Sequence, residues 1–345
     1  MPGDPDACDP DTCDPGWQHI AGALGPPKGA YDADIVILAL DRPEETMAAI
    51  RSAQTQLGVS KHVTVVDQGS RPDALTCLVN MISGCSDTTL LSAGRNLGVP
   101  GGRNRGTAAG HGRVIVGLDN DAVFDTAFTV AAMVAAIDDN PNLAAIGVRI
   151  VIHSTGEDDL SSWGYPAALL CQAGQSFDAV TFVGAGHAIR RAAWDTAGGY
   201  DERLFFCWEE YDFCLRAVSL GWSIQYHGAI LVRHKVSPER RVTWAGDRWF
   251  HFVRNRLYIA RKHGASWISL LPRMLGYVLK SARNGCLRDT PRAILAAHRL
   301  AWDIQPRSLP QAARDYVDRA DTTHRGTWLA RLRRDVLSAL PGTTV

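Results

Sequence analysis

Short apolar runs alternate with longer amphipathic stretches along the first two thirds of the chain. A run at residues 35–38 is followed by a helix-like stretch at 43–57 and by a second run at 63–66, and a third run lies at 114–118. Strand-length apolar runs separated by helices of about ten to fifteen residues are typical of βαβ units, whose parallel sheet is covered on both faces. The pattern therefore predicts an α/β protein with a doubly wound, mostly parallel sheet flanked by helices.

Both ends of the chain differ from this middle part. The Asp-Pro dipeptide occurs three times near the N-terminus and is followed by a Gly/Pro cluster, and both features disfavour helix and strand. After residue 236 the apolar runs give way to helical, arginine-rich stretches at 249–263 and 267–280. We therefore predict a flexible leader at 1–30, an α/β domain at 31–236 and a basic helical region at 237–345.

Charge adds an asymmetry to this division. The chain has 36 Lys and Arg against 36 Asp and Glu, and a net charge of zero argues against a protein that works by coating nucleic acid. However, 22 of the basic residues and only 8 of the acidic ones lie after Ile230. Arg-rich helices with interleaved Trp and Leu predict either peripheral contact with a membrane surface or a solvated cationic face packed on the α/β domain.

Cysteine use and hydropathy indicate the compartment. None of the eight cysteines forms a Cys-x-x-Cys pair, and Cys77, Cys171 and Cys214 fall in apparent core segments, which predicts reduced, buried thiols. The N-terminus lacks a basic stretch followed by an apolar one, and no window approaches the roughly 18 uninterrupted apolar residues of a spanning helix. We therefore expect a cytoplasmic protein, at most apposed to the inner face of a membrane.

Carboxylates follow all three predicted strands. The first run leads to Asp41, the second to Asp67, and the third to Asp119-Asn120-Asp121. Ligands of such sheets bind beyond the carboxyl ends of the strands, so these side chains are expected in one crevice. Two carboxylates separated by one residue can bind a hard divalent cation, although a solvated acidic loop would have the same sequence.

A second acidic group lies at 209–212. Tyr211 and Cys214 begin an apolar spacing that predicts a helix starting near Glu209. Glu209 and Glu210 could supply a general base or simply complement the helix dipole. For Asp212 the structural alternative, an i,i+4 ion pair with Arg216, is favoured.

Two further elements are weaker in isolation. Residues 96–106 hold glycines that permit close backbone approach and arginines that could face phosphate, but they match neither the P-loop nor the dinucleotide fingerprint. His234 follows an apolar run, where a lone histidine is usually structural and is sometimes a metal ligand.

In order along the chain, these elements resemble the family-2 inverting glycosyltransferases with the GT-A fold. The similarity looks closest to the bacterial branch that contains rhamnosyl- and galactofuranosyltransferases. The matching stretches span about 200 residues, and they are 35–43, 65–70, 96–106, 118–121, 184–191, 198–202, 208–216 and 233–234.

The resemblance implies a role for each matching position. Asp67 would contact the nucleobase, and Asp119 with Asp121 would hold the nucleotide and a Mg²⁺ or Mn²⁺ ion, for which His234 would be a further ligand. Glu210 is the second member of the paired acidic motif and would deprotonate the acceptor. The remaining donor-binding positions would be Asp41, Asn96, Gly102, Arg103, Asn104 and Asn120. The acceptor and sugar pocket would be bordered by His187, Trp208 and Asp212.

Two departures from the family pattern bear on specificity. The family often has Thr-Tyr-Asn after its first strand, whereas this chain has Ala39-Leu40-Asp41, without an aromatic residue to stack on the base. The acidic motif usually has an aspartate where Glu210 stands. The sequence leaves the nucleobase, the sugar, the acceptor and the oligomeric state open.

The predicted activity is a metal-assisted, inverting transfer of a sugar from a nucleoside-diphosphate donor, with UDP or dTDP favoured, to a hydroxyl acceptor. A sugar nucleotidyltransferase is the rival enzyme, and it would carry a phosphate-gripping glycine-rich loop after its first strand, where this chain has residues 41–45. A non-catalytic nucleotide-sugar-binding protein is the rival of another class.

Overall fold

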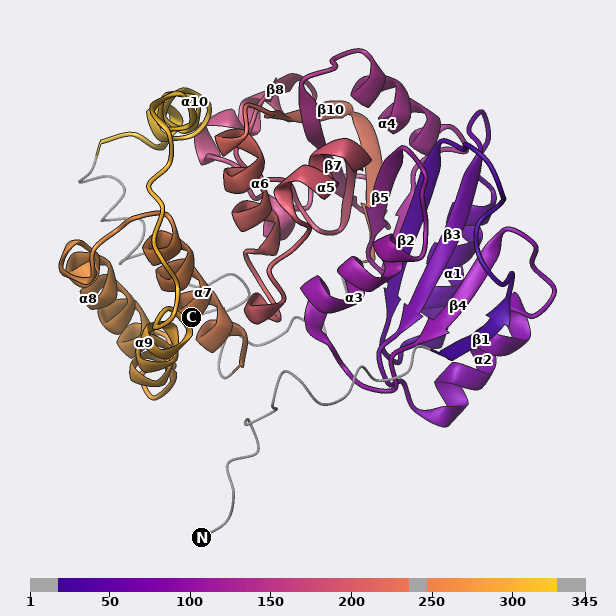
Figure 1. Cartoon of the computed structure of the whole chain (residues 1–345), viewed down its shortest axis with the longest axis horizontal. Helices are drawn as coiled ribbons and strands as arrows, with labels where there is room; N and C mark the ends of the chain where they lie inside the picture. The colour runs from indigo at the N-terminus through magenta and orange to yellow at the C-terminus, as the bar shows by residue number, and fades with distance from the viewer. Residues whose placement is uncertain (1–17, 236–246, 328–345) are drawn as a thin grey trace, which may run out of the picture.

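The computed structural model describes residues 18–235 and 247–327 (Figure 1). Within these residues the strands form one ten-stranded sheet in the order β1-β4-β3-β2-β5-β9-β7-β10-β6, with β8 paired to β10. The strands are β1 (Gln18–Gly22), β2 (Ala33–Ala39), β3 (Lys61–Asp67), β4 (Thr88–Ser92), β5 (Val114–Leu118), β6 (Ala122–Phe124), β7 (Leu143–Ile152), β8 (Ser176–Asp178), β9 (Gly186–Arg190) and β10 (Ser223–His234).

The half of the sheet nearest the N-terminus has the predicted parallel arrangement. β4, β3, β2 and β5 are parallel neighbours in this order. Three helices connect them along the chain: α1 (Pro43–Gln54), α2 (Pro72–Ile82) and α3 (Gly98–Ala108). The three predicted apolar runs are the cores of β2, β3 and β5. Because these strands are buried on both faces, their sequences are continuously apolar.

The other half of the sheet is mixed. β9 is antiparallel to both β5 and β7, β10 is parallel to β7, and β6 is antiparallel to β10. The register pairs Leu118 with Gly186, so β9 begins at the edge of the sheet where β5 ends. The reversal therefore brings the loop before β9 to the same edge as Asp119.

Helices cover both faces of the sheet. One face packs on α1, α2 and α4 (Thr129–Asp138), and the other on α3, α5 (Arg191–Ala197) and α6 (Glu209–Ser219). α3 lies so close to the sheet that a Cβ on Gly106 would be 2.4 Å from Val36 Cγ1. The predicted helix near Glu209 is confirmed as α6, with Cys214, Leu215 and Val218 buried.

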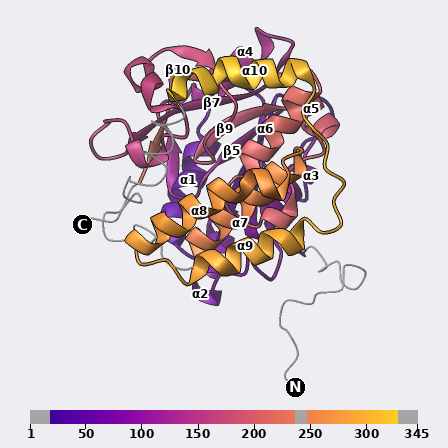
Figure 2. The ribbon, with the colours of Figure 1, turned by 90° about the vertical axis from the view of Figure 1, so that its left-hand side faces the viewer.

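Three helices after residue 246 form a separate layer with its own apolar cluster. They are α7 (Asp247–Lys262), α8 (Trp267–Arg283) and α9 (Asp289–Leu300), which lie at one end of the molecule (Figures 1 and 2). α10 (Gln311–Ala320) instead returns to the sheet domain, where the Tyr316 hydroxyl donates to Ile224 O at 2.7 Å. The basic region is thus helical as predicted, but its last described helix packs on the α/β domain.

Three expectations need correction. Residues 1–17 lie outside the described residues, but 18–22 of the predicted leader form β1, which pairs antiparallel with β4. β4 would otherwise be an edge strand with unpaired backbone groups, and residues 18–22 pair with them. The Gly/Pro content of the leader gives no information about this long-range pairing. Cys77 and Cys171 are exposed and only Cys214 of the three is buried, because Cys77 lies off the face of α2 that buries Leu78.

The six cysteines in the described parts of the chain are free thiols. No helix in residues 18–235 or 247–327 combines the length and apolarity needed to cross a membrane.

Candidate functional site

The ends of β2 and β5 meet across a direct ion pair. Asp41 and Arg42 follow β2 with φ of 54° and 52°, in the left-handed region that non-glycine residues seldom adopt. This turn directs the Arg42 guanidinium to Asp121, where Nη1 donates to Oδ2 at 2.8 Å. The expectation that the strand-end residues share one edge of the sheet is therefore met.

Asp67 is 1% exposed and organises the loop after β3. Its carboxylate accepts hydrogen bonds from the backbone N–H groups of Gly69 and Ser70 at 3.2 and 3.1 Å, and from Ser92 Oγ at 3.1 Å. Asp41 caps the same loop by accepting from the Arg71 N–H at 2.9 Å. Both predicted donor-binding carboxylates thus stabilise the loop that follows β3.

Residues 96–104 form a helix start rather than a phosphate-facing loop. Asn96 Oδ1 accepts from the Gly98 N–H at 2.8 Å, and Gly102 lies so close to the sheet that a Cβ there would be 2.9 Å from Leu38 Cδ2. The backbone at Gly102 is therefore buried against β2.

The structure turns two predicted donor-binding side chains, Arg103 and Asn104, toward the interior of the fold, although Arg103 was expected to be able to face phosphate. Arg103 is 3% exposed, and its Nη2 donates to Asp119 Oδ1 at 2.9 Å while its Nη1 donates to the Val36 carbonyl. Asn104 donates to Tyr200 O and accepts from the Tyr200 N–H. Because α3 packs on the sheet, these two side chains contact the interior of the fold, where Arg103 binds Asp119 and Asn104 binds the backbone of Tyr200.

Asp121 and His234 lie side by side. His234 Nε2 is 3.3 Å from Asp121 Oδ1, and its Nδ1 is 2.8 Å from Asp159 Oδ2. Burial opposes the charged imidazole, but hydrogen bonds to the two carboxylates outweigh it and raise the pKa of His234 to about 10. His234 is therefore an imidazolium held between two carboxylates in this state.

The predicted metal ligands Asp119, Asp121 and His234 are not arranged around a common point. Asp119 is bound by Arg103 through Oδ1 and Asp121 by Arg42 through Oδ2, and Asn120 donates to Thr46 Oγ1 at 3.2 Å. Within the described residues no group of three or more His, Cys, Asp or Glu side chains is arranged around one point as a metal site. Two arginines occupy the carboxylates instead.

Asp159 was missed by the sequence analysis. It lies 75 positions before His234, is 5% exposed, and also accepts from Ser161 Oγ and Ser162 Oγ at 2.5 and 2.6 Å. In the sequence, Asp159 looks like the N-cap of the single turn at 160–162. That local pattern does not indicate a contact with His234. Only the fold could reveal this contact.

The two glutamates at the start of α6 have different surroundings. Glu209 is 3% exposed and its Oε2 has no hydrogen-bond partner, and burial together with neighbouring Glu210 raises its pKa well above the ordinary range. Glu210 is half-buried, with Oε1 against Gly184, where a Cβ would be 2.6 Å away. Burial, supported by the nearby charge of Asp119, raises the pKa of Glu210 to about 7.

His187 is placed inside the fold rather than at an open pocket, which corrects its predicted position. It is 2% exposed, stacks on Phe182 and sits over Gly117, where a Cβ would meet its ring at 2.2 Å. Burial, followed by repulsion from Arg103, lowers the pKa of His187 to about 3. The imidazole is neutral because β9 packs it against β5.

Trp208 lies between α6 and α7. Its backbone has φ of 75°, and the Arg256 guanidinium stacks over its ring at 4.3 Å. Its buried Nε1 has no hydrogen-bond partner. Asn255 of α7 holds the turn just before Trp208 by donating to three carbonyls at 2.8–2.9 Å, those of Leu204, Phe206 and Cys207. α7 therefore helps to set the backbone that presents Glu209 and Glu210.

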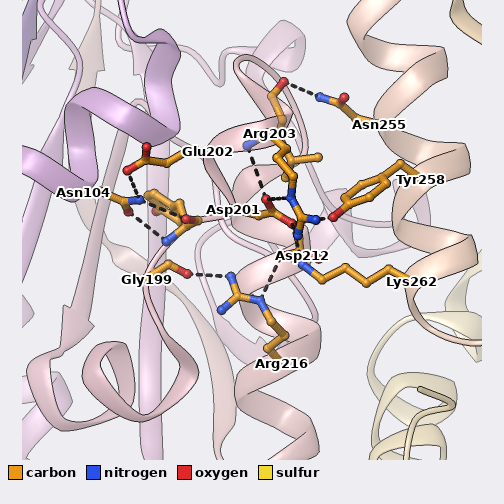
Figure 3. A network of polar contacts seen from close by, with 12 residues as sticks. Asn104, Gly199, Asp201, Glu202, Arg203, Asp212, Arg216, Asn255, Tyr258 and Lys262 are labelled. Atoms are coloured by element: carbon orange, nitrogen blue, oxygen red, sulfur yellow. Dashed lines mark hydrogen bonds and ion pairs between the residues drawn. The ribbon is translucent and has the colours of Figure 1, made fainter. Parts of the chain in front are cut away.

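Asp212 belongs to a buried ion network that fastens α7 to α6 (Figure 3). Its Oδ2 accepts from Arg216 Nε and Lys262 Nζ, both at 2.9 Å, and Lys262 also donates to Asp201 Oδ2 at 2.8 Å. Tyr258 donates to the same Asp201 oxygen at 2.8 Å. The predicted pocket role of Asp212 is thus replaced by the i,i+4 pair that the sequence also indicated.

We expect Asp212→Ala to lower the free energy of unfolding by about 3–5 kcal/mol, because it removes the buried carboxylate that pairs with both Arg216 and Lys262 and leaves Lys262 with Asp201 alone. Asp195→Ala, at an exposed aspartate of α5, should change it by less than about 0.5 kcal/mol. Urea unfolding of both variants measures the difference. Equal stability of the two variants would show that the network contributes nothing.

The same network predicts an acid-dependent loss of stability. Burial opposes ionisation, but Arg203 and Lys262 lower the pKa of Asp201 to about 2, and the cations around Asp212 lower its pKa as well. Groups with a depressed folded-state pKa stabilise the protein above their unfolded value near 4 and lose this effect as pH falls. Asp212→Ala should therefore flatten the fall in stability between pH 4 and pH 2.

Comparison with known proteins gives one family match. Residues 34–196 match the family model described as glycosyl transferase family 2. In a comparison with curated proteins, no sequence matches this chain.

Solved structures share the fold at low identity. A mannosyltransferase from Pyrobaculum calidifontis, in complex with GDP-Man and Mn²⁺, is 13% identical with a TM-score of 0.53, over 90% of this chain and 80% of that chain. GalNAc-T7 with UDP, GalNAc and Mn²⁺ is 14% identical with a TM-score of 0.53, over 84% of this chain. The match spans 58% of the length of GalNAc-T7. These likenesses confirm the predicted α/β architecture.

Proposed function

We propose that the chain is a glycosyltransferase that moves a sugar, with inversion, from a nucleoside-diphosphate donor to a hydroxyl acceptor. The match of residues 34–196 to the glycosyl transferase family 2 model, and the fold shared with solved glycosyltransferases, support this proposal. The observation that supports it most is the environment of Glu210. This half-buried carboxylate lies at the start of α6, near Asp119, and its pKa is raised to about 7. A group of that pKa can exchange a proton with substrate at neutral pH.

Glu210 acts as the general base in this proposal. It takes the proton of the acceptor hydroxyl as that oxygen attacks the anomeric carbon, and the bond from that carbon to the diphosphate breaks in the same step. One displacement inverts the configuration and requires no covalent enzyme intermediate. Burial, followed by the nearby charge of Glu210, raises the pKa of Glu209 well above its usual range, which favours the neutral form of Glu209 beside the base.

Asp121 and His234 are the proposed protein ligands of a divalent ion, with Asp119 contributing from the same loop. Metal-bound histidines usually donate their other ring N–H to a carboxylate, and Asp159 is placed 2.8 Å from His234 Nδ1 to accept it. The donor set fits Mg²⁺ or Mn²⁺ once Nε2 has lost its proton. Such an ion would neutralise charge on the departing diphosphate.

The two arginines in the crevice suggest how the site is kept in order before the donor binds. Arg42 and Arg103 neutralise Asp121 and Asp119, which otherwise lie close enough to repel one another. Arg42, whose side chain is 29% exposed, could release Asp121 as a ligand for the divalent ion and would then be able to contact a donor phosphate. Arg103 is 4% exposed and should stay on Asp119.

The proposed donor is a UDP- or dTDP-sugar, and Asp67 is the proposed contact to its base. The rim formed by the loops after β2 and β3 carries Leu40, which is 39% exposed, where an aromatic residue is often found in the family. An aliphatic side chain gives less stacking energy to the base. Discrimination between bases should therefore depend mainly on hydrogen bonds made in this rim.

Transfer is tested by release of nucleoside diphosphate from UDP-, dTDP- and GDP-sugars, with and without Mn²⁺, together with NMR of the product. We expect UDP or dTDP to be released only with the metal, and the product linkage to have the opposite anomeric configuration to the donor. A retained configuration would contradict the single displacement. Formation of a sugar nucleotide and pyrophosphate from a nucleoside triphosphate and a sugar phosphate would favour a nucleotidyltransferase.

A further inference from the structure

α8 exposes a stripe of large aliphatic side chains. Ile268, Leu271, Leu275 and Leu279 are 80%, 58%, 60% and 47% exposed. At about 100° per residue these four positions fall within an arc of about 80° on the helix. The opposite side, at Leu270 and Ser281, is buried in the layer formed with α7 and α9. The stripe therefore faces away from the protein along the length of the helix.

Aromatic side chains extend the stripe at the N-terminal end of α8. Trp302, which follows α9, is 74% exposed, and His298 lies between it and Trp267 with ring centroids 5.5 and 5.2 Å away. Trp302 and Ile268 thus lie at the same end of α8. Tryptophan is enriched where a protein meets the headgroup region of a bilayer, because its ring is apolar and its N–H is polar.

Positive charge surrounds this apolar surface. From residue 267 to residue 300 the chain has six Lys and Arg and one acidic residue, Asp289. α8 itself contains no Asp or Glu, and Arg283 lies beside the stripe, about 80° from its centre, whereas Arg273 and Lys280 project from the opposite side of the helix. Figure 2 shows α8 and α9 in front on the outer face of the molecule.

We infer that α8 and its flanking arginines bind the surface of an anionic lipid bilayer. The helix would lie in the plane of the interface, with the aliphatic stripe and Trp302 among the acyl chains and the arginines at the lipid phosphates. α8 would not cross the bilayer, because no helix of the described residues is long and apolar enough to do so. Charge is the reason for choosing a bilayer over a protein partner, because residues 267–300 contain six basic side chains and one acidic side chain, which favours an extended anionic surface.

The orientation is compatible with catalysis. α8 belongs to the layer that α7 fastens to α6 through Lys262 and Asp212, and Asn255 of α7 holds the turn that leads to the glutamates. A bilayer on α8 therefore lies on the far side of α7 from the glutamates and does not cover them. The inference concerns binding only, and it holds for any donor or acceptor of the enzyme.

Co-sedimentation of the full chain with vesicles tests this inference. Vesicles of phosphatidylcholine with 30% phosphatidylserine should bind the protein at low salt, and pure phosphatidylcholine vesicles should bind it at least about tenfold more weakly. Leu271→Ser/Leu275→Ser should reduce binding to the anionic vesicles by at least about tenfold. Arg283→Gln/Arg288→Gln, which removes the exposed arginine at the end of α8 and the exposed arginine directly before α9, should reduce it less and should weaken its dependence on salt.

The matched control is Leu57→Ser/Leu220→Ser, which removes leucines that are 54% and 57% exposed on the α/β domain. It should bind vesicles as the wild type does. Thermal melting of each variant checks folding, and transfer to a water-soluble acceptor should be unchanged in all of them, so failure of the membrane inference and failure of the proposed transfer are separate results.

Three outcomes would overturn the inference. The first is a wild type that does not bind anionic vesicles at low salt. The second is a dimer in analytical ultracentrifugation that Leu271→Ser/Leu275→Ser abolishes, which would assign the stripe to a second copy of the chain. The third is a wild type without vesicle binding whose stripe variant melts at a lower temperature, which would assign the stripe to another segment of the same chain.

Discussion

Glu210→Gln is expected to lower kcat by a factor of about 10²–10⁴ while nucleotide binding persists. The amide has nearly the shape of the carboxyl group but cannot take the proton of the acceptor. The loss corresponds to about 3–5 kcal/mol of activation free energy. The measurement is kcat with saturating donor and acceptor, and binding of the nucleoside diphosphate is followed separately by calorimetry.

Glu209→Gln is the matched control for this variant. The Glu209 carboxyl group is buried without a partner for Oε2, and its raised pKa favours the neutral form, which a glutamine resembles in charge and shape. We expect measurable turnover close to the wild-type rate. If Glu209→Gln is inactive and Glu210→Gln turns over normally, the base assignment must move to Glu209.

The pH profile gives an independent check of the same assignment. The pKa of Glu210 is raised to about 7, and only its deprotonated form can act as the base. Below pH 7 the logarithm of kcat/KM should therefore fall with a slope approaching one, and it should level off above pH 7. A rate that is unchanged from pH 5 to pH 8 would contradict a base with this pKa.

Asp121→Ala is expected to remove the metal dependence of transfer together with most of the activity. Charge stabilisation by a bound ion is worth several kcal/mol, or about 10²–10³ in rate. Asp125→Ala is matched for burial, since both side chains are 19% exposed, and for pairing, since Asp125 binds Arg233. It should keep the response to Mn²⁺. Full activity of Asp121→Ala in excess chelator would refute the proposed site.

Asp159→Ala provides a graded version of the same test. Loss of a carboxylate that orients a metal-bound histidine typically weakens metal affinity by about 10–100-fold. The concentration of Mn²⁺ that gives half-maximal activity, and half-maximal thermal stabilisation, should rise by that factor while the rate at saturating metal recovers. An unchanged Mn²⁺ requirement would show that Asp159 only caps the turn at 160–162 and does not orient a metal-bound His234.

The sequence by itself determined the parallel half of the sheet and the start of α6. β2, β3 and β5 were readable because strands buried on both faces are continuously apolar, which is a local property. Their carboxyl ends share one edge in a parallel sheet, so Asp41 and Asp121 could be placed together before the fold was known. The ion pair of Asp212 with Arg216 was also readable, since helical spacing brings the two side chains together.

The tertiary structure decided which of these charged groups are available. Arg103 and Asn104 look like phosphate ligands in the sequence, but α3 packs on the sheet and turns them to Asp119 and Tyr200. β1 was hidden in a segment with the composition of a leader because its pairing with β4 depends on residues about 70 positions away.

Electrostatics at the site depended on contacts between distant positions. His234 meets Asp159 and Asp121, which are 75 and 113 positions earlier in the chain, and these contacts set its charge. Glu209 and Glu210 are neighbours with the same side chain, yet α6 buries one fully and leaves the other half-buried. The cost of moving a charge out of water depends on everything packed around it, so the sequence could locate the acidic pair, while only the packing of the fold distinguishes the surroundings of its two members.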